Sequence, residues 1–208
     1  VSKDKIAILP AKADDEKFLY GLRNHESIRK QMFDSGSISL DTHRNWFAKS
    51  LSNPDRDIFI LKKNNTKIGQ VRFDKYGTIA EVDISILPTE AGKGYGTYLL
   101  LKTCHEYISA QAGIQELKAR VKKISIKAFL KAGFHIDRNE DVCELIFSAN
   151  LSNIIVATTK SWNIENFYSL KESETKFNWI LLKNKQELIT DILDSIDPRF
   201  IFFPHWSW

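Results

Sequence analysis

Gly92, Gly94 and Gly96, three glycines separated by single residues, are the feature of this sequence that most clearly predicts chemistry. They follow a run of β-branched and aliphatic residues from 79 to 87 that stops at Pro88, which is typical of a strand. Apolar residues then recur at helical spacing from Thr97 onward. Glycines at such a corner expose backbone N–H groups, and the first helical turn adds unpaired donors and a positive dipole end. The segment therefore predicts a phosphate or pyrophosphate site.

The spacing of the glycines narrows the kind of phosphate loop. A GxxxxGK[ST] loop is excluded because no GK[ST] follows Gly92, and GxGxxG is excluded because the third glycine comes one residue too early. The segment 91–96 fits Q/R-x-x-G-x-G/A, although Ala91 occupies the first position. An ordinary tight turn between a strand and a helix is the alternative interpretation.

The strand before the loop carries polar side chains at every second position. If it is extended, Glu81, Asp83 and Ser85 share one face. A carboxylate on that face can act as a general base, or it can simply pair with a nearby Lys or Arg.

Composition excludes several classes of function. The chain has 208 residues, 43% hydrophobic and 27% charged, and a net charge of +4, which is too balanced to predict nucleic-acid binding. Cys104 and Cys143 are isolated, and the five histidines form no HExxH, so we expect neither a metal site nor a disulfide framework. No apolar run reaches 18 residues and no signal peptide is recognisable, so we expect no membrane association and a cytoplasmic location.

The remaining elements are predicted from turn signals and periodicity. The expected order is strand, helices, three strands, helix, strand, helix, strand. The predicted ranges are strands at 5–9, 57–62, 67–73, 79–87, 115–121 and 142–147, and helices from 14 to 23, 26 to 32, 39 to 51, 97 to about 112 (with Gly113 as the C′ residue) and 125 to 131.

This order over roughly residues 3–150, together with the loop, resembles the GNAT superfamily of N-acetyltransferases. A second segment, SIKAFLKAGF at 125–134, resembles the family's S-I-x-x-Y-x-K-x-G-F element. The resemblance implies an α/β GNAT fold with a mixed, mostly antiparallel twisted sheet flanked by helices. It also implies acetyl-CoA as the cofactor, bound at the glycine loop.

The same resemblance implies roles for individual residues. Glu81 is the expected base, and a backbone N–H near Ile86 or Leu87, freed by a bulge, is expected to polarise the thioester carbonyl. Phe129 stands where the family usually has a tyrosine acid, and Lys122 where it often has an asparagine. The expected cofactor-binding residues are Ile86, Leu87, Gly92, Lys93, Gly94, Tyr95, Gly96, Thr97, Lys122, Ser125 and Phe129.

The N-terminal segments 22–33 and 38–43 resemble amino-sugar N-acetyltransferases of the pseudaminic acid pathway, and partly resemble ribosomal-protein N-terminal acetyltransferases. The resemblance favours acetyl transfer to a primary amine of a small molecule, in particular a nucleotide-linked amino sugar. Two alternatives stay open: a protein acetyltransferase, and a coenzyme-binding regulatory module with weakened turnover. The expected substrate-binding residues are Arg23, Arg29, Met32, His43, Trp46 and Phe73.

The last part of the chain predicts a separate piece. Strands at 154–157, 177–182 and 199–203 alternate with helices at 164–170 and 185–195, a β-α-β-α-β Rossmann-like half-domain. The segment resembles the opening half of formyltransferases related to methionyl-tRNA formyltransferase, without their catalytic set, so we expect no formyl transfer. We therefore predict domains at 1–150 and 151–208. The half-sheet should pack on the first domain, on a second copy as a homodimer, or on a missing remainder.

Overall fold

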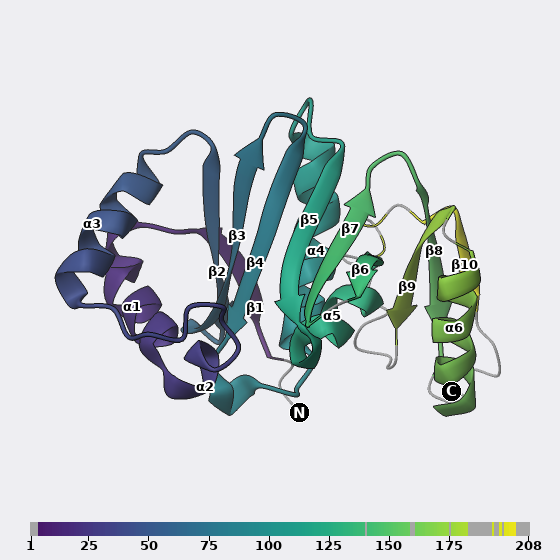
Figure 1. Cartoon of the computed structure of the whole chain (residues 1–208), viewed down its shortest axis with the longest axis horizontal. Helices are drawn as coiled ribbons and strands as arrows, with labels where there is room; N and C mark the ends of the chain where they lie inside the picture. Colours follow the sequence, from purple (N-terminus) through teal and green to yellow (C-terminus); the bar gives the residue numbers. More distant parts are fainter. Residues whose placement is uncertain are drawn as a thin grey trace. The chain divides into compact units, whose positions relative to one another are not determined.

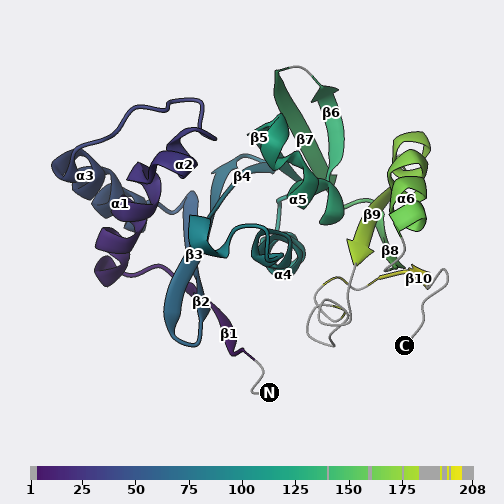
Figure 2. The ribbon, with the colours of Figure 1, turned by 90° about the horizontal axis from the view of Figure 1, so that it is seen from below.

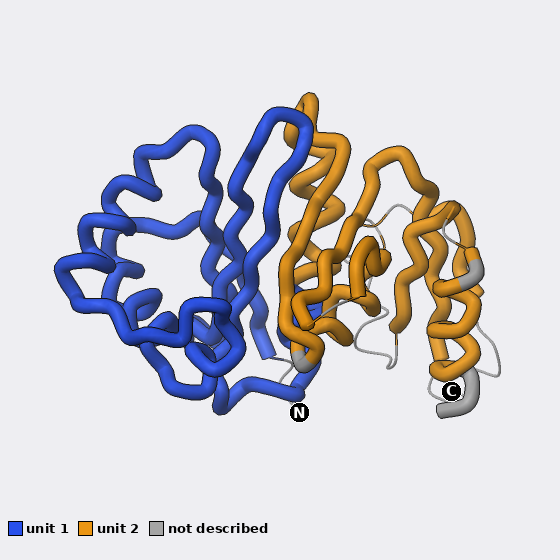
Figure 3. The backbone as a smooth tube through the Cα atoms, viewed as in Figure 1, with its two compact units in different colours: residues 1–99 blue, residues 100–208 orange. Residues whose placement is uncertain are grey.

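The chain forms two compact units that meet within one helix. The computed structural model describes residues 4–139, 141–158, 161–174, 176–182, 193, 196 and 198–202. Unit 1 is Val1–Leu99 and unit 2 is Leu100–Trp208, so the division falls inside helix α4 (Tyr95–Ala110) (Figure 3). The predicted boundary near residue 150 lies instead in a turn between two strands of unit 2. The domains 1–150 and 151–208 stay a prediction.

Unit 1 contains an antiparallel sheet whose strands are neighbours in chain order (Figure 1). They are β1 (Ile6–Pro10), β2 (Arg56–Lys63), β3 (Thr66–Tyr76) and β4 (Ile79–Ile86). The predicted hairpin between β2 and β3 turns at Asn64 and Asn65, whose φ angles are +48° and +67°. Asparagine tolerates left-handed angles better than most residues do, which explains why this pair makes the turn.

The helices of unit 1 gather on one side of this sheet (Figure 2). They are α1 (Glu16–Asn24), α2 (Glu26–Arg29) and α3 (Leu40–Leu51), with a 3-10 turn at Ala13–Asp15. Ser39 caps α3, because its Oγ accepts a hydrogen bond from the Thr42 N–H at 3.1 Å. A core joins these helices to β2 and consists of Leu19, Phe47, Ile58 and Ile60.

Unit 2 begins with the rest of α4 and a second antiparallel set of strands. These are β5 (Glu116–Lys122), β7 (Val142–Ser148) and β6 (His135–Asn139), in that spatial order, and α5 (Ile126–Lys131) precedes β6. The sequence did not predict β6. Four of its five residues are exposed, so its polar composition hides the alternation that marks a half-buried strand.

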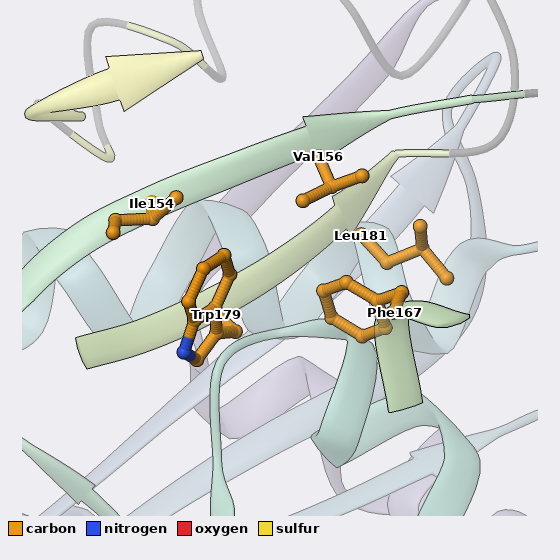
Figure 4. Close-up of a cluster of buried hydrophobic side chains, with 5 residues drawn as sticks. All are labelled: Ile154, Val156, Phe167, Trp179 and Leu181. Carbon is orange, nitrogen blue, oxygen red and sulfur yellow. The ribbon is translucent and has the colours of Figure 1, made fainter. Parts of the chain in front are cut away.

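A small parallel sheet completes unit 2, in the order β10-β8-β9. Its elements are β8 (Ser152–Ala157), α6 (Ser161–Ser173), β9 (Phe177–Leu182) and β10 (Phe200–Phe202). Figure 4 shows its apolar core, made of Ile154, Val156, Phe167, Trp179 and Leu181. The predicted helix at 185–195 lies, apart from residue 193, outside the described residues.

Candidate active site

The predicted phosphate loop opens helix α4. A 3-10 turn at Pro88–Glu90 follows β4, and the chain then passes through Gly92 and Gly94, whose φ angles are +76° and +90°. Glycine adopts such angles without the steric cost that other residues meet, so both positions favour it. A Cβ built at Gly92 would meet no atom within 4 Å, so the backbone there is open to an approaching group.

The start of α4 supplies donors next to these glycines. The Tyr98 N–H donates to the Gly94 carbonyl at 2.9 Å, an early hydrogen bond of the helix. The N–H groups of Tyr95, Gly96 and Thr97 precede it, at positions where an α-helix lacks intrahelical acceptors. Together with the dipole of a 16-residue helix, they suit an anion such as a pyrophosphate. The residues present therefore fit the diphosphate of a coenzyme.

Charged side chains around the loop are paired with one another. Glu90 lies between two lysines, with Lys93 Nζ 3.1 Å from its Oε1 and Lys63 Nζ 3.7 Å from its Oε2. Lys63 also lies over the Tyr95 ring, 5.3 Å from its centroid, and 3.2 Å from Asp4. Hydrogen bonds to Tyr95 and Asp4 raise the pKa of Lys63, so it stays charged. Two ammonium groups are thus held beside the glycines.

Strand β4 places its polar residues on one face, as predicted. Its register with β3 sets Glu81 opposite Asp74, Asp83 opposite Arg72 and Ser85 opposite Gln70. Asp83 Oδ2 lies 3.6 Å from Arg72 Nη1 and accepts from Gln70 Nε2 at 3.4 Å. Among the described residues, Glu81 has no ion pair and no hydrogen bond from its side chain. Of the two carboxylates of β4, Asp83 therefore has such partners and Glu81 has none among the described residues.

Two arginines neutralise the carboxylate opposite Glu81. Asp74 is 7% exposed, and its Oδ2 accepts from Arg72 Nε at 2.7 Å while its Oδ1 pairs with Arg56 Nε. Trp46 of α3 faces both guanidinium groups, at 5.8 Å from Arg72 and 5.6 Å from Arg56. Burial opposes the charge of Arg72, but Asp83, Asp74 and Glu81 together raise its pKa. The network keeps two like charges, Asp74 and Glu81, compatible on adjacent strands.

The backbone N–H groups of Ile86 and Leu87, both predicted to polarise the thioester carbonyl, differ in their hydrogen bonding. The Leu87 N–H donates to the Ile68 carbonyl at 2.8 Å, so it is part of the ladder with β3. Along an antiparallel strand, the N–H groups of successive residues point alternately toward the partner strand and away from it. The Ile86 N–H therefore points away from β3. The pairing of β4 with β3 shows no register shift from Ile79 to Ile86. Of the two, Ile86 is therefore the better candidate.

The two arginines predicted to bind substrate, Arg23 and Arg29, donate hydrogen bonds to carbonyls of one loop of unit 1. Arg23 donates to the carbonyls of Asp34 and Gly36, both at 3.2 Å. Arg29 Nη1 donates to the Ser35 carbonyl at 2.9 Å. Both guanidinium groups therefore fix the turn between α2 and α3, which is a structural use that sequence reasoning did not anticipate.

The other predicted acceptor residues differ in exposure. Met32 and Trp46 are half-buried, so each has surface that a substrate can reach. His43 is 1% exposed among Tyr20, Trp46 and Phe47, and burial lowers its pKa. Phe73 has no exposed surface and packs edge-on against Phe59, on the opposite face of the sheet from Arg72. Both belong to the core.

Three of the predicted cofactor residues belong to unit 2. Lys122 is the last residue of β5 and pairs with Val142. Ser125 directly precedes α5 and does not cap it through its side chain. Phe129 is 1% exposed and packs edge-on against Phe134, with 5.2 Å between ring centroids. A phenyl ring in that position has no proton to donate.

Sequence reasoning missed Arg56, Arg72 and Asp74, which build the charged layer beneath Trp46. A signal existed, because Gln70, Arg72 and Asp74 alternate along one strand. Only the register between strands shows that they oppose the β4 carboxylates. Among the described residues, no group of three or more His, Cys, Asp or Glu side chains is placed to hold a metal ion.

The solved structures that resemble this chain include two acetyltransferases and a further domain. A spermidine N-acetyltransferase from Vibrio cholerae, in complex with CoA and spermine, has a TM-score of 0.61 and 18% identity, covering 69% of this chain and 95% of that one. An aminoglycoside acetyltransferase in complex with coenzyme A and kanamycin has a TM-score of 0.60 and 14% identity, covering 70% and 95%. A domain from Methanocaldococcus jannaschii has a TM-score of 0.60 and 22% identity, covering 70% and 99%.

No curated protein matches the chain in sequence. No helix in the described part of the chain is long and apolar enough to cross a membrane. The family model for the acetyltransferase (GNAT) domain matches residues 5–135. That match spans more than half of the chain and includes the glycine loop and both carboxylates of β4. The chain therefore belongs to the GNAT acetyltransferase family and is an acetyl-CoA-dependent N-acetyltransferase.

Proposed function

We propose that this enzyme acetylates a primary amine of a small molecule, with an amino sugar as the favoured class of acceptor. The observation that carries the proposal is that unit 1 contains both a helix start suited to an anion and a strand face on which Glu81 has no ion pair among the described residues. Acetyl-CoA supplies the activated acetyl group. The N–H groups of residues 95–97, opened by Gly92 and Gly94, hold its diphosphate.

Glu81 acts as the base in this proposal. It takes a proton from the acceptor nitrogen, directly or through water, because only a neutral amine attacks a thioester. The Ile86 N–H polarises the carbonyl that is attacked. The nitrogen–carbon bond forms as the carbon–sulfur bond breaks, and the departing sulfur takes its proton from solvent or substrate, since Phe129 has none to give.

Amino sugars are favoured over other amines by two similarities. The N-terminal segments resemble amino-sugar acetyltransferases, and a similar solved structure contains kanamycin, an aminoglycoside that includes amino sugars. A nucleotide carrier is a finer part of the proposal that rests on the sequence resemblance alone, because Arg23 and Arg29 already donate to loop carbonyls. We expect the enzyme to work in the cytoplasm.

Two measurements test this proposal. Acetyl-CoA should raise the melting temperature, because a ligand of the folded state stabilises it. Thiol release with a nucleotide-linked amino sugar, kanamycin, spermidine and an N-terminal peptide then ranks the acceptors. A rise in melting temperature without thiol release favours the second candidate function, a coenzyme-binding module with weakened catalysis. The specific observation behind this candidate is the buried Phe129. Turnover with the peptide alone contradicts the small-molecule assignment.

We also propose that residues 151–208 form a domain of their own, related to the start of formyltransferases. The supporting observations are the parallel pairing of β8 with β9 and with β10, and the helix α6 between the first two. The exposed Phe200 and Phe202 of edge strand β10, each 50% exposed, make this sheet the candidate contact of a homodimer. Incubation with formyl-tetrahydrofolate and an amino sugar should give no formylated product.

A further inference from the structure

Asp83 is held by one of its two carboxylate oxygens. Arg72 Nη1 lies 3.6 Å from Oδ2, and Gln70 Nε2 donates to the same Oδ2 at 3.4 Å. Oδ1 has no partner among the described residues. The side chain as a whole is 38% exposed, so Asp83 is open to solvent. A carboxylate fixed by one oxygen and open at the other is prepared to accept one more hydrogen bond.

The donors that hold Oδ2 are themselves fixed. Arg72 donates through Nε to Asp74 at 2.7 Å, and its guanidinium faces the Trp46 ring at 5.8 Å. Gln70 is 8% exposed. Arg72 therefore links the buried Asp74 to the partly exposed Asp83, and two side chains of the neighbouring strand β3 orient Asp83.

Glu81 lies two residues from Asp83 on the same strand face. Neighbours on one face of a strand are roughly 7 Å apart, which is a distance that one amine group and its substituents can span. Glu81 has no ion pair among the described residues, whereas Asp83 is paired on one side. The paired carboxylate already has partners that hold it in place, which suits an anchor, whereas the Glu81 carboxylate can approach the nitrogen of a bound amine.

We propose that Asp83 anchors the acceptor amine through Oδ1, and that Arg72 is a positioning residue that acts through Asp83. Glu81 removes the proton from the anchored nitrogen. The inference rests on the proposed function and refines it, since it assigns recognition and proton removal to different carboxylates. It favours acceptors with a cationic amine and a further hydrogen-bond donor.

The test is Asp83→Asn, with Asp57→Asn as its matched control. Asp57 is 34% exposed and lies 3.5 Å from Lys75, but it faces the other side of the sheet, opposite Phe73. With kanamycin as the acceptor, Asp83→Asn should raise the amine KM at least about tenfold, the usual range for a charge-assisted hydrogen bond. The KM for acetyl-CoA and the acidic limb of the pH profile, which reports the Glu81 base, should not change. Asp57→Asn should leave both KM values as they are.

Arg72→Met supplies the second comparison. If Arg72 acts through Asp83, the double variant Asp83→Asn/Arg72→Met should have the same amine KM as Asp83→Asn, whereas additive effects contradict positioning. Kanamycin binding measured by calorimetry in the presence of CoA gives the same comparison without turnover. Unchanged kanamycin affinity in Asp83→Asn overturns the inference alone. A wild-type protein that binds kanamycin but acetylates no acceptor contradicts the proposed function alone, and one that neither binds nor acetylates contradicts both.

Discussion

The two units bury charged groups in opposite ways. In unit 1, the buried Asp74 lies between Arg56 and Arg72, so each charge faces an opposite one. In unit 2, Lys171 is 5% exposed and its ammonium donates to the Trp179 carbonyl at 3.1 Å. Within the described part of the chain, no carboxylate pairs with Lys171. Two cations therefore compensate the buried Asp74 of unit 1, whereas the buried Lys171 of unit 2 has no carboxylate partner among the described residues and burial lowers its pKa.

The titration of the buried bases in unit 2 follows from this difference. Burial lowers the pKa of Lys171 to about 7 and that of His105 to about 4. Burial and the nearby charge of Lys171 lower the pKa of His135 to about 4. Arg56, Arg72 and Asp74 of unit 1 lie on the sheet face that carries the candidate site. The bases of unit 2 are neutralised in a core that apolar packing holds together, which fits a structural role.

The largest effect is expected from Lys171→Met. The folded-state pKa lies below that of the unfolded chain, so the unfolded chain binds the extra proton between about pH 7 and 10.5. The free energy of unfolding of the wild type should therefore rise with pH across this interval, by at most roughly 5 kcal/mol at 1.36 kcal/mol per pKa unit. Lys171→Met should be more stable at pH 7 and lose this slope. Urea denaturation at several pH values measures this dependence. If the free energy of unfolding changes with pH equally in both proteins, Lys171 does not have a lowered pKa in the folded state.

A somewhat smaller effect is expected from Asp74→Ala in unit 1. Removing the shared partner leaves Arg56 and Arg72 half-buried and uncompensated, which typically costs about 3–5 kcal/mol for a buried pair and less for a partly exposed one. The midpoint of urea denaturation at neutral pH measures the loss. Asp74→Asn should recover part of it through hydrogen bonds. If Asp74→Ala is as stable as the wild type, the charge network does not hold unit 1.

Gly133→Ala tests the packing of unit 2. Gly133 has a φ of +102°, and an added Cβ would lie 3.0 Å from the Phe147 ring and 3.3 Å from Ile180. Strain and overpacking together should cost about 1–3 kcal/mol. The matched control is Gly21→Ala in α1, where a Cβ would meet nothing within 4 Å and should stabilise by about 0.5–1 kcal/mol. Equal stabilities of the two variants in thermal melts would show that unit 2 is loosely packed at this point.

The smallest effect is expected from Asp41→Ala, which removes an exposed ion pair of unit 1. The Asp41 side chain is 86% exposed and lies 3.4 Å from Arg44, which Glu16 also contacts at 3.3 Å. Exposed pairs contribute little, so the free energy of unfolding should change by less than about 0.5 kcal/mol. A loss comparable to that of Asp74→Ala would mean that burial does not decide the strength of pairing here.

The sequence alone predicted most of the elements that position the site. The glycine loop, the strand before it and the helix after it were all found from local signals, because turn residues and periodicity act over a few neighbours. The shared face of Glu81, Asp83 and Ser85 also followed from strand geometry, since side chains alternate with a period of two. The exposed edge strand β6 was missed because its composition carries no such pattern.

The tertiary structure decided which of these residues are engaged. The register between β3 and β4 placed Arg72 opposite Asp83 and Asp74 opposite Glu81. The turn at 34–36 brought backbone carbonyls within hydrogen-bonding distance of the Arg23 and Arg29 side chains. The same register put Phe73 in the core. Strand pairing and loop closure join residues that are distant in sequence, so their energies depend on partners that no local pattern contains. Local chemistry could thus be predicted from the sequence, while partners and burial required the fold.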